Sequence, residues 1–174
     1  LTDLGIKLGD RVSVQVAKSP EALYLYLACL RAGFVFHPLN TGYKETELDY
    51  FLSNAEPAIV ICDELDEQLM AKLCRNNNVA HLLTLNADGG GSLVTNAKTA
   101  AADFAVVDRK DDDLAALLYS SGTTGVPKGI MLSHLNLRSN AECLLEAWGF
   151  SSDDVLLHAL PIFHVHGLFV ALGC

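Results

Sequence analysis

Short apolar runs alternate with helix-like segments along most of this chain, and this alternation restricts the available folds more than any other feature. The runs typical of strands are residues 11–16, 34–36, 58–62, 79–85, 114–118 and 155–159. The segments typical of helices are residues 21–32, 44–53, 65–75, 133–148 and the stretch from residue 163 onward. Parallel strands need a crossover connection, usually a helix, so strands that alternate with helices of about 10–15 residues indicate βαβ units. The predicted fold class is therefore α/β, with a largely parallel sheet.

Residues that favour helix ends stand at several of these boundaries. Ser19 and Pro20 supply an N-cap and a first-turn proline for the first helix, and Gly33 suits its C-terminal end. Ser133 is the expected N-cap of the last long helix. Residues 86–102 are rich in glycine, alanine and asparagine, which indicates a loop or a weak helix.

The composition sets limits on class and partners. Hydrophobic residues make up 51% of the chain and charged residues 19%, so there is ample material for a core and little case for disorder. The formal net charge of −9 argues against nucleic acid or an anionic membrane as a partner, because both are polyanions. Five scattered cysteines without a Cys-x-x-Cys pair indicate reduced thiols, a cytoplasmic location by default, and no metal site within this chain.

Both ends resemble the interior of a longer protein. There is no initiator methionine or signal pattern, and the chain stops within the apolar run at residues 167–174. We therefore expect a fragment of a larger soluble protein, whose preceding segment could have carried a mitochondrial address. Residues 155–174 contain no Asp, Glu, Lys or Arg, so a membrane span must be considered. Pro161 and three histidines within this stretch favour a buried strand, turn and helix instead.

Residues 119–129 read Tyr-Ser-Ser-Gly-Thr-Thr-Gly-Val-Pro-Lys-Gly and directly follow an apolar run. Hydroxyls and glycine N–H groups suit phosphate oxygens, and Lys128 adds a positive charge. A Walker A loop is excluded because Lys128 is followed by glycine where Ser or Thr is required. A dinucleotide fingerprint is excluded because its glycine spacing differs. An ordinary flexible linker would not combine this pattern with a preceding buried strand, so the segment predicts a phosphate-binding loop.

This segment resembles the signature of the adenylate-forming superfamily, which includes acyl-CoA synthetases, luciferases and the adenylation domains of peptide synthetases. Residues 130–137, 30–33 and 38–40 are similar to further family blocks, so the resemblance covers nearly the whole chain. It implies that residues 1–174 are part of the large N-terminal AMP-binding domain. It also implies that the phosphates of ATP, and then the leaving pyrophosphate, are held by Ser120, Ser121, Gly122, Thr123, Thr124, Gly125, Val126, Pro127 and Lys128. For Tyr119 we prefer a packing role at the end of the strand.

A second block, residues 160–169, reads Leu-Pro-Ile-Phe-His-Val-His-Gly-Leu-Phe. Taken alone, a histidine in an apolar stretch is usually a core residue, and two histidines two apart on a helix point to different faces, which argues against joint metal ligation. Superfamily members carry a similar block beside the acyl and adenylate site. The resemblance implies a substrate-binding role for His164, His166 and Gly167, and makes His164 a candidate catalytic residue. Many relatives are apolar at the position of His166, so a histidine there favours an acid with a second carboxylate.

Within the superfamily the chain is most similar to malonyl-CoA synthetases, on residues 39–43, 47–51 and 158–170. The resemblance implies that malonate is activated with ATP and Mg²⁺ and transferred to CoA, which gives malonyl-CoA, AMP and pyrophosphate through a malonyl-adenylate. The residue that meets Mg²⁺, the adenine contacts and the catalytic lysine of a C-terminal domain would lie beyond Cys174, so the fragment alone should be inactive. Two alternatives stay open: another short-chain, medium-chain or aryl acyl-CoA ligase, and a non-catalytic nucleotide-binding module.

Overall fold

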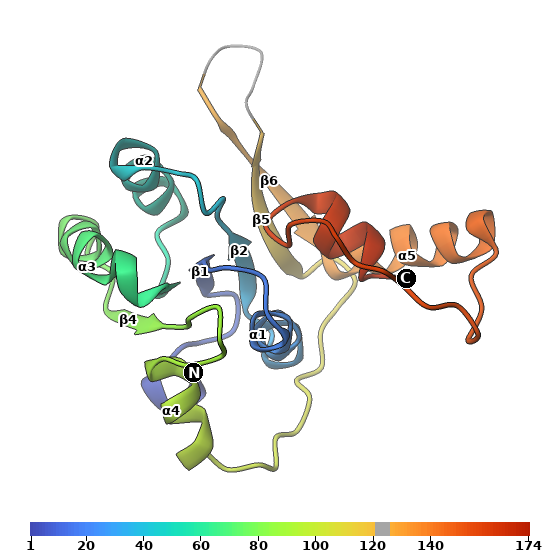
Figure 1. Cartoon of the computed structure of the whole chain (residues 1–174), viewed down its shortest axis with the longest axis horizontal. Helices are drawn as coiled ribbons and strands as arrows, with labels where there is room; N and C mark the ends of the chain where they lie inside the picture. The colour runs from blue at the N-terminus through green and yellow to red at the C-terminus, as the bar shows by residue number, and fades with distance from the viewer. Residues whose placement is uncertain (121–125) are drawn as a thin grey trace.

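One six-stranded sheet organises the computed structural model, which describes residues 1–120 and 126–174. The strands are β1 (Arg11–Gln15), β2 (Val35–Pro38), β3 (Ile59–Cys62), β4 (His81–Thr84), β5 (Leu114–Ser120) and β6 (Lys128–Ser133). Their order across the sheet is β4-β3-β1-β2-β5-β6. Strands β1 to β5 pair in parallel, whereas β6 pairs antiparallel with β5. The predicted α/β fold with a largely parallel sheet is confirmed (Figure 1).

Helices connect the parallel strands as the alternation predicts. The helices are α1 (Pro20–Ala32), α2 (Glu45–Ala55), α3 (Glu67–Asn76), α4 (Ser92–Thr99) and α5 (His134–Trp148), with short helices η1 (Thr2–Leu4) and η2 (Glu64–Asp66) and the π-helix η3 (His166–Ala171). Of these, α1 to α4 lie between successive parallel strands, whereas α5 follows β6. The predicted caps are confirmed. Ser19 Oγ accepts a hydrogen bond from the N–H of Ala22 at 3.1 Å, and Gly33 ends α1 with a φ of 72°. Ser133 caps α5 in the same way. The weak helix expected between residues 86 and 102 is α4.

The sheet is covered on both faces, which explains why its strands are apolar throughout. In β3, Ile59 and Ile61 pack with residues of α1, whereas Val60 and Cys62 pack with residues of α2 and α3. Successive side chains of a strand point to opposite faces, so α1 covers one face of the sheet and the α2–α3 pair covers the other (Figure 1).

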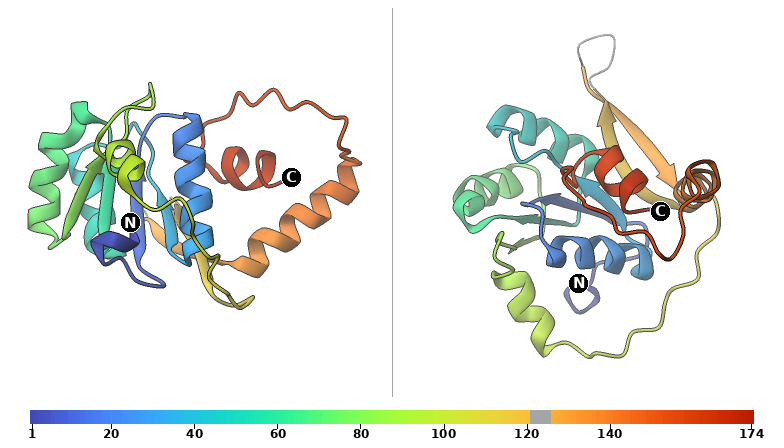
Figure 2. Two further views of the ribbon diagram at one scale, coloured as in Figure 1. Left: turned by 90° about the horizontal axis from the view of Figure 1, so that it is seen from below. Right: turned by 45° about the vertical axis from the view of Figure 1, so that its right-hand side comes forward.

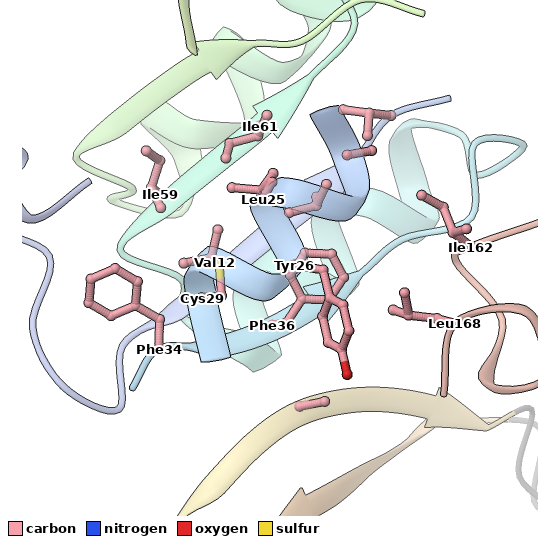
Figure 3. Close-up of a cluster of buried hydrophobic side chains, with 14 of the residues drawn as sticks. Val12, Leu25, Tyr26, Cys29, Phe34, Phe36, Ile59, Ile61, Ile162 and Leu168 are labelled. Atoms are coloured by element: carbon pink, nitrogen blue, oxygen red, sulfur yellow. The ribbon is translucent and has the colours of Figure 1, made fainter. Parts of the chain in front are cut away.

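Helix η3 is anchored on the α1 side of the sheet. The ring of Tyr26 in α1 lies 5.2 Å from that of Phe36 in β2 and 5.7 Å from that of Phe169 in η3. Ile162 and Leu168 face the same cluster (Figure 3). Helix α5 extends away from the sheet, and the chain then returns so that η3 lies beside α1 (Figure 2). The second sequence block is thereby brought back to the sheet.

The strand predicted at residues 155–159 is wrong. This segment has no regular secondary structure, and Val155 and Leu157 are 95% and 92% exposed. The reason is the lack of a neighbour: β6 occupies the edge beside β5, so the segment pairs with no strand in the described residues. The helix expected from residue 163 onward is present as η3. Across residues 1–120 and 126–174, no helix combines the length and the apolar character that crossing a membrane requires.

Candidate functional site

The predicted phosphate segment is the connection of the β5–β6 hairpin. Ser120 ends β5 and Lys128 begins β6, and the two are directly opposite each other in the ladder. The described ends of both strands extend past the rest of the sheet (Figure 1). Ser120 and Pro127 are half-buried, whereas Val126 and Lys128 are exposed. The other predicted phosphate ligands, Ser121, Gly122, Thr123, Thr124 and Gly125, lie outside the described residues.

The hairpin ends beside α2, where an aromatic cluster packs against it. The ring of Tyr119 lies 4.7 Å from that of Phe51, and its hydroxyl donates a 2.6 Å hydrogen bond to Asn54 Oδ1. The hydroxyl of Tyr50 donates to the carbonyl of Pro127 at 2.7 Å. Burial, and secondly the neighbouring Tyr50, raise the pKa of Tyr119 to about 12, so its hydroxyl stays protonated at neutral pH. The packing role predicted for Tyr119 is confirmed.

Two hollows meet at Tyr119, at the carboxyl ends of β2 and β5. The larger, of about 540 Å³, is lined by α2 and by the hairpin residues Ser120, Val126 and Pro127. The smaller, of about 60 Å³, is lined by Asn40, Tyr119 and His164 among others. In open α/β sheets ligands bind outside the carboxyl ends of the strands. Another hollow, of about 660 Å³, lies between α1, the N-terminal residues 1–3 and residues 100–104. It is away from this edge, and we assign it no role in the site.

The second block is held in place by contacts with its backbone. Lys18, just after β1, donates to the carbonyls of His158 and Leu160 at 2.8 and 3.3 Å. His158 Nε2 lies 2.9 Å from the carbonyl oxygen of Gly167 and donates to it. A Cβ on Gly167 would lie 2.1 Å from the carbonyl oxygen of Pro161, so only glycine fits there without movement of the backbone. These contacts close the chain into a loop that presents His164 and His166.

Both predicted histidines are exposed at this loop. His164 lies just before η3 and lines the smaller hollow with Tyr119, so the structure brings it close to the base of the phosphate segment. His166 is the first residue of η3. Gly167 is buried beneath them. The two sequence blocks, about forty residues apart, thus lie at the same edge of the sheet.

Sequence reasoning missed three polar residues that organise this edge. Gln15 of β1 is 3% exposed, and its amide donates to the carbonyls of Asn40 and Tyr43 at 2.8 and 3.3 Å, which fixes the turn after β2. The other two are Tyr50 and Asn54 of α2. A signal did exist for Gln15, because an amide at the end of an apolar strand needs buried partners. Tyr50 and Asn54 carry only a weak one, their spacing of one helical turn.

The described residues offer no ready metal site. Within residues 1–120 and 126–174 no group of three His, Cys, Asp or Glu side chains gathers closely enough to hold an ion. The resemblance gives the residue that meets Mg²⁺ a place beyond Cys174, so no chemical step is assigned to the metal.

The chain is similar to several known proteins. A family model described as AMP-binding enzyme matches residues 1–174. The ATP-bound structure of MatB from Rhodopseudomonas palustris is similar with a TM-score of 0.94 and 54% identity, over 98% of this chain and 34% of that one. The malonate–CoA ligase of Arabidopsis thaliana is 31% identical over 165 residues, which cover 94% of this chain and 27% of the relative. The oxalate–CoA ligase of the same plant is 30% identical over 178 residues, at 99% and 34% coverage. The chain thus spans about a quarter to a third of the length of these relatives.

Proposed function

The chain belongs to the family of AMP-binding enzymes, and on this premise we propose that the full-length protein is an acid–thiol ligase for malonate. It would activate malonate with ATP as malonyl-adenylate and pass the malonyl group to CoA, giving malonyl-CoA, AMP and pyrophosphate. The observation that carries the proposal is the meeting of the two sequence blocks at Tyr119. One block has the composition of a pyrophosphate-binding loop, and the other places His164 in the hollow that Tyr119 lines.

The hairpin would stabilise the charge that develops during adenylation. A carboxylate oxygen of the acid attacks the α-phosphorus, the bond from that phosphorus to the bridging oxygen breaks, and the electron pair leaves with pyrophosphate. Donors held in place before the reaction stabilise such charge without reorganising. Ser120 and Lys128 are suited to this role because they face each other at the base of the connection. We propose that Ser121 to Gly125 contribute the remaining hydroxyls and N–H groups.

His164 and His166 would recognise the acid. A second carboxylate accepts hydrogen bonds or an ion pair from imidazole, whereas an apolar acyl tail would leave both rings without such a partner. Two of the relatives support this choice, since malonate and oxalate, the acids in their names, are both dicarboxylates. The likeness to ATP-bound MatB supports ATP as the nucleotide. Malonate is preferred to oxalate because the sequence blocks at residues 39–43 and 158–170 resemble malonyl-CoA synthetases.

Two other functions make different predictions for the same assay. Another short-chain, medium-chain or aryl acyl-CoA ligase would form AMP with acetate, a longer monocarboxylate or benzoate in preference to malonate. A nucleotide-binding module without chemistry would bind ATP and form no AMP with any acid. The full-length protein should therefore be assayed for CoA-dependent AMP formation with malonate, oxalate, acetate, butyrate and benzoate.

His166→Phe tests how the acid is recognised. Loss of one charge-assisted contact should lower kcat/KM for malonate by about 10- to 100-fold, with a much smaller change for butyrate. His81→Phe is the matched control, because His81 lies in β4 at the opposite edge of the sheet and should leave both values unchanged. Equal losses for malonate and butyrate in His166→Phe would rule out recognition of the second carboxylate by this residue.

A further inference from the structure

One face of α2 holds both strands of the hairpin at their ends. Tyr50 and Asn54 are one helical turn apart and therefore lie on the same face of the helix. The hydroxyl of Tyr50 donates to the carbonyl of Pro127, and Asn54 Oδ1 accepts from the hydroxyl of Tyr119. These contacts join residues 77 and 65 positions apart in the sequence. One anchors the end of β5 and the other the chain that enters β6.

Each anchor lies one residue before a predicted phosphate ligand. Tyr119 precedes Ser120, and Pro127 precedes Lys128, while Ser120 and Lys128 themselves form a ladder pair. The bond from Tyr50 also fixes a peptide plane. In a trans peptide the carbonyl and the following N–H point in opposite directions. With the carbonyl of Pro127 directed at Tyr50, the N–H of Lys128 is turned away from α2.

Packing makes the two contacts a rigid unit. The rings of Tyr50, Phe51 and Tyr119 pack together with centroid distances of 5.5, 4.7 and 6.3 Å for the three pairs. Tyrosine has only two side-chain torsions, so a packed ring places its hydroxyl accurately. Helix α2 is itself fixed to the sheet by Leu48, Leu52 and Phe51, all buried. The core of the domain thereby fixes the position of the hairpin ends.

We propose that Tyr50 and Asn54 are positioning residues, which hold Ser120 and Lys128 in the geometry that receives the β- and γ-phosphates and the leaving pyrophosphate. The proposal rests on the proposed function for the phosphate segment and extends it to a helix that contacts no phosphate itself. Neither residue is assigned a chemical step. Their effect should be confined to the steps that involve ATP and pyrophosphate.

The test compares three variants of the full-length protein, Tyr50→Phe, Asn54→Ala and the control Tyr24→Phe. Tyr50→Phe removes one hydroxyl and keeps the ring. Asn54→Ala removes the acceptor and raises the helix propensity of α2, so a loss of function cannot be attributed to a weaker helix. Tyr24 is an exposed residue of α1, on the opposite face of the sheet from α2.

We expect Tyr50→Phe and Asn54→Ala each to raise the KM for ATP and for pyrophosphate in the exchange reaction by about 2- to 12-fold, the factor that one ordinary hydrogen bond supplies. The KM for malonate and the rate of transfer from preformed malonyl-adenylate to CoA should match those of wild type and Tyr24→Phe, and the melting temperature should fall by no more than the loss of one hydrogen bond accounts for. Unchanged KM values for ATP and pyrophosphate in both variants would overturn the proposal. Equal losses in adenylation and transfer, together with a lower melting temperature, would show a purely structural role and would also overturn it.

ATP binding separates this proposal from the proposed reaction. Calorimetric titration with ATP needs no turnover, so it measures the binding of ATP, including its phosphates, without any chemical step. If wild type binds ATP but activates no acid, the proposed reaction fails, and a Kd for ATP weakened in Tyr50→Phe and Asn54→Ala still supports the positioning role. If wild type and both variants bind ATP equally, the positioning role fails whatever the reaction. If wild type binds no ATP, both proposals fail.

Discussion

Acidification should weaken the sheet beneath the site through one buried side chain, His37 of β2. Its Nδ1 lies 2.8 Å from Ser13 Oγ in β1, and its Nε2 is buried without a hydrogen-bond partner among the described residues. Its ring lies 5.4 Å from that of Tyr119, so it sits close to the base of the hairpin. Burial lowers the pKa of His37 from 6.5 to about 3. The folded protein therefore holds this imidazole neutral, and a proton on it would be a buried charge without a partner.

The direction and size of the effect follow from the two pKa values. Between about pH 3 and pH 6.5 the unfolded chain binds this proton and the folded chain does not. The stability that His37 contributes as a neutral group is therefore fully present above pH 6.5 and is lost as the pH falls toward 3. The complete loss is about 5 kcal/mol, at 1.36 kcal/mol for each pH unit. About 2 kcal/mol of it is already lost on going from about pH 8 to about pH 5.

Hydrogen exchange of peptides covering β1 and β2 measures this loss where it occurs. In the full-length protein, the free energy of opening should be compared over about pH 5 to 8 between wild type and His37→Gln, which cannot titrate in this range. The wild-type value should fall by about 2 kcal/mol more than that of the variant. The variant also controls for the other titrating groups, since they are common to both proteins. Parallel falls in the two proteins would refute the account of His37 as a buried neutral group.

Two substitutions test how the second block is held. Gly167→Ala places a methyl group against the carbonyl oxygen of Pro161, so it should destabilise the protein by about 1–3 kcal/mol in thermal unfolding and raise the KM for malonate more than that for ATP; an unchanged melting temperature would contradict the close contact. Lys18→Met removes the donor to the carbonyls of His158 and Leu160, so it should raise the KM for malonate by about 2- to 10-fold while stability changes by about 0.5 kcal/mol or less. An unaltered KM for malonate would show that Lys18 does not position this loop.

The parallel part of the fold could be predicted because β1 to β4 are each followed by a helix, and the ends of the first of these helices are recognisable in the sequence. Ser19, Pro20 and Gly33 mark α1 in the sequence and act in the structure as caps. Strand β6 was missed because its apolar core, from Ile130 to Leu132, is only three residues long and shows no alternation. It forms because the hairpin brings it alongside β5, which is a tertiary effect. Residues 155–159 show the opposite error, because a strand was predicted there and none forms. A strand-like composition cannot form a strand without a partner strand.

The two sequence blocks of the site could be predicted, but their proximity in the folded chain could not. The residue types in the segment 119–129 indicate phosphate binding, because hydroxyls, glycines and a lysine have few other common uses in that arrangement. That His164 shares a hollow with Tyr119 depends on the return of η3 to α1, which no local pattern encodes. The contacts of Tyr50 and Asn54 depend on the packing of α2 against β5. Such contacts join residues far apart in sequence, and a single sequence carries no direct signal for them.

Malonate-dependent exchange of pyrophosphate into ATP tests the central claim most directly. The reaction needs only adenylation and its reversal, so it reports on the pyrophosphate-binding loop and the acid site without CoA. With the purified full-length protein, labelled pyrophosphate should enter ATP when malonate is present, and Lys128→Ala should reduce this exchange by about 10²- to 10³-fold. Exchange that proceeds with acetate or benzoate but not with malonate would contradict the assignment of the acid. No exchange with any carboxylate, in a protein that binds ATP, would contradict adenylation itself.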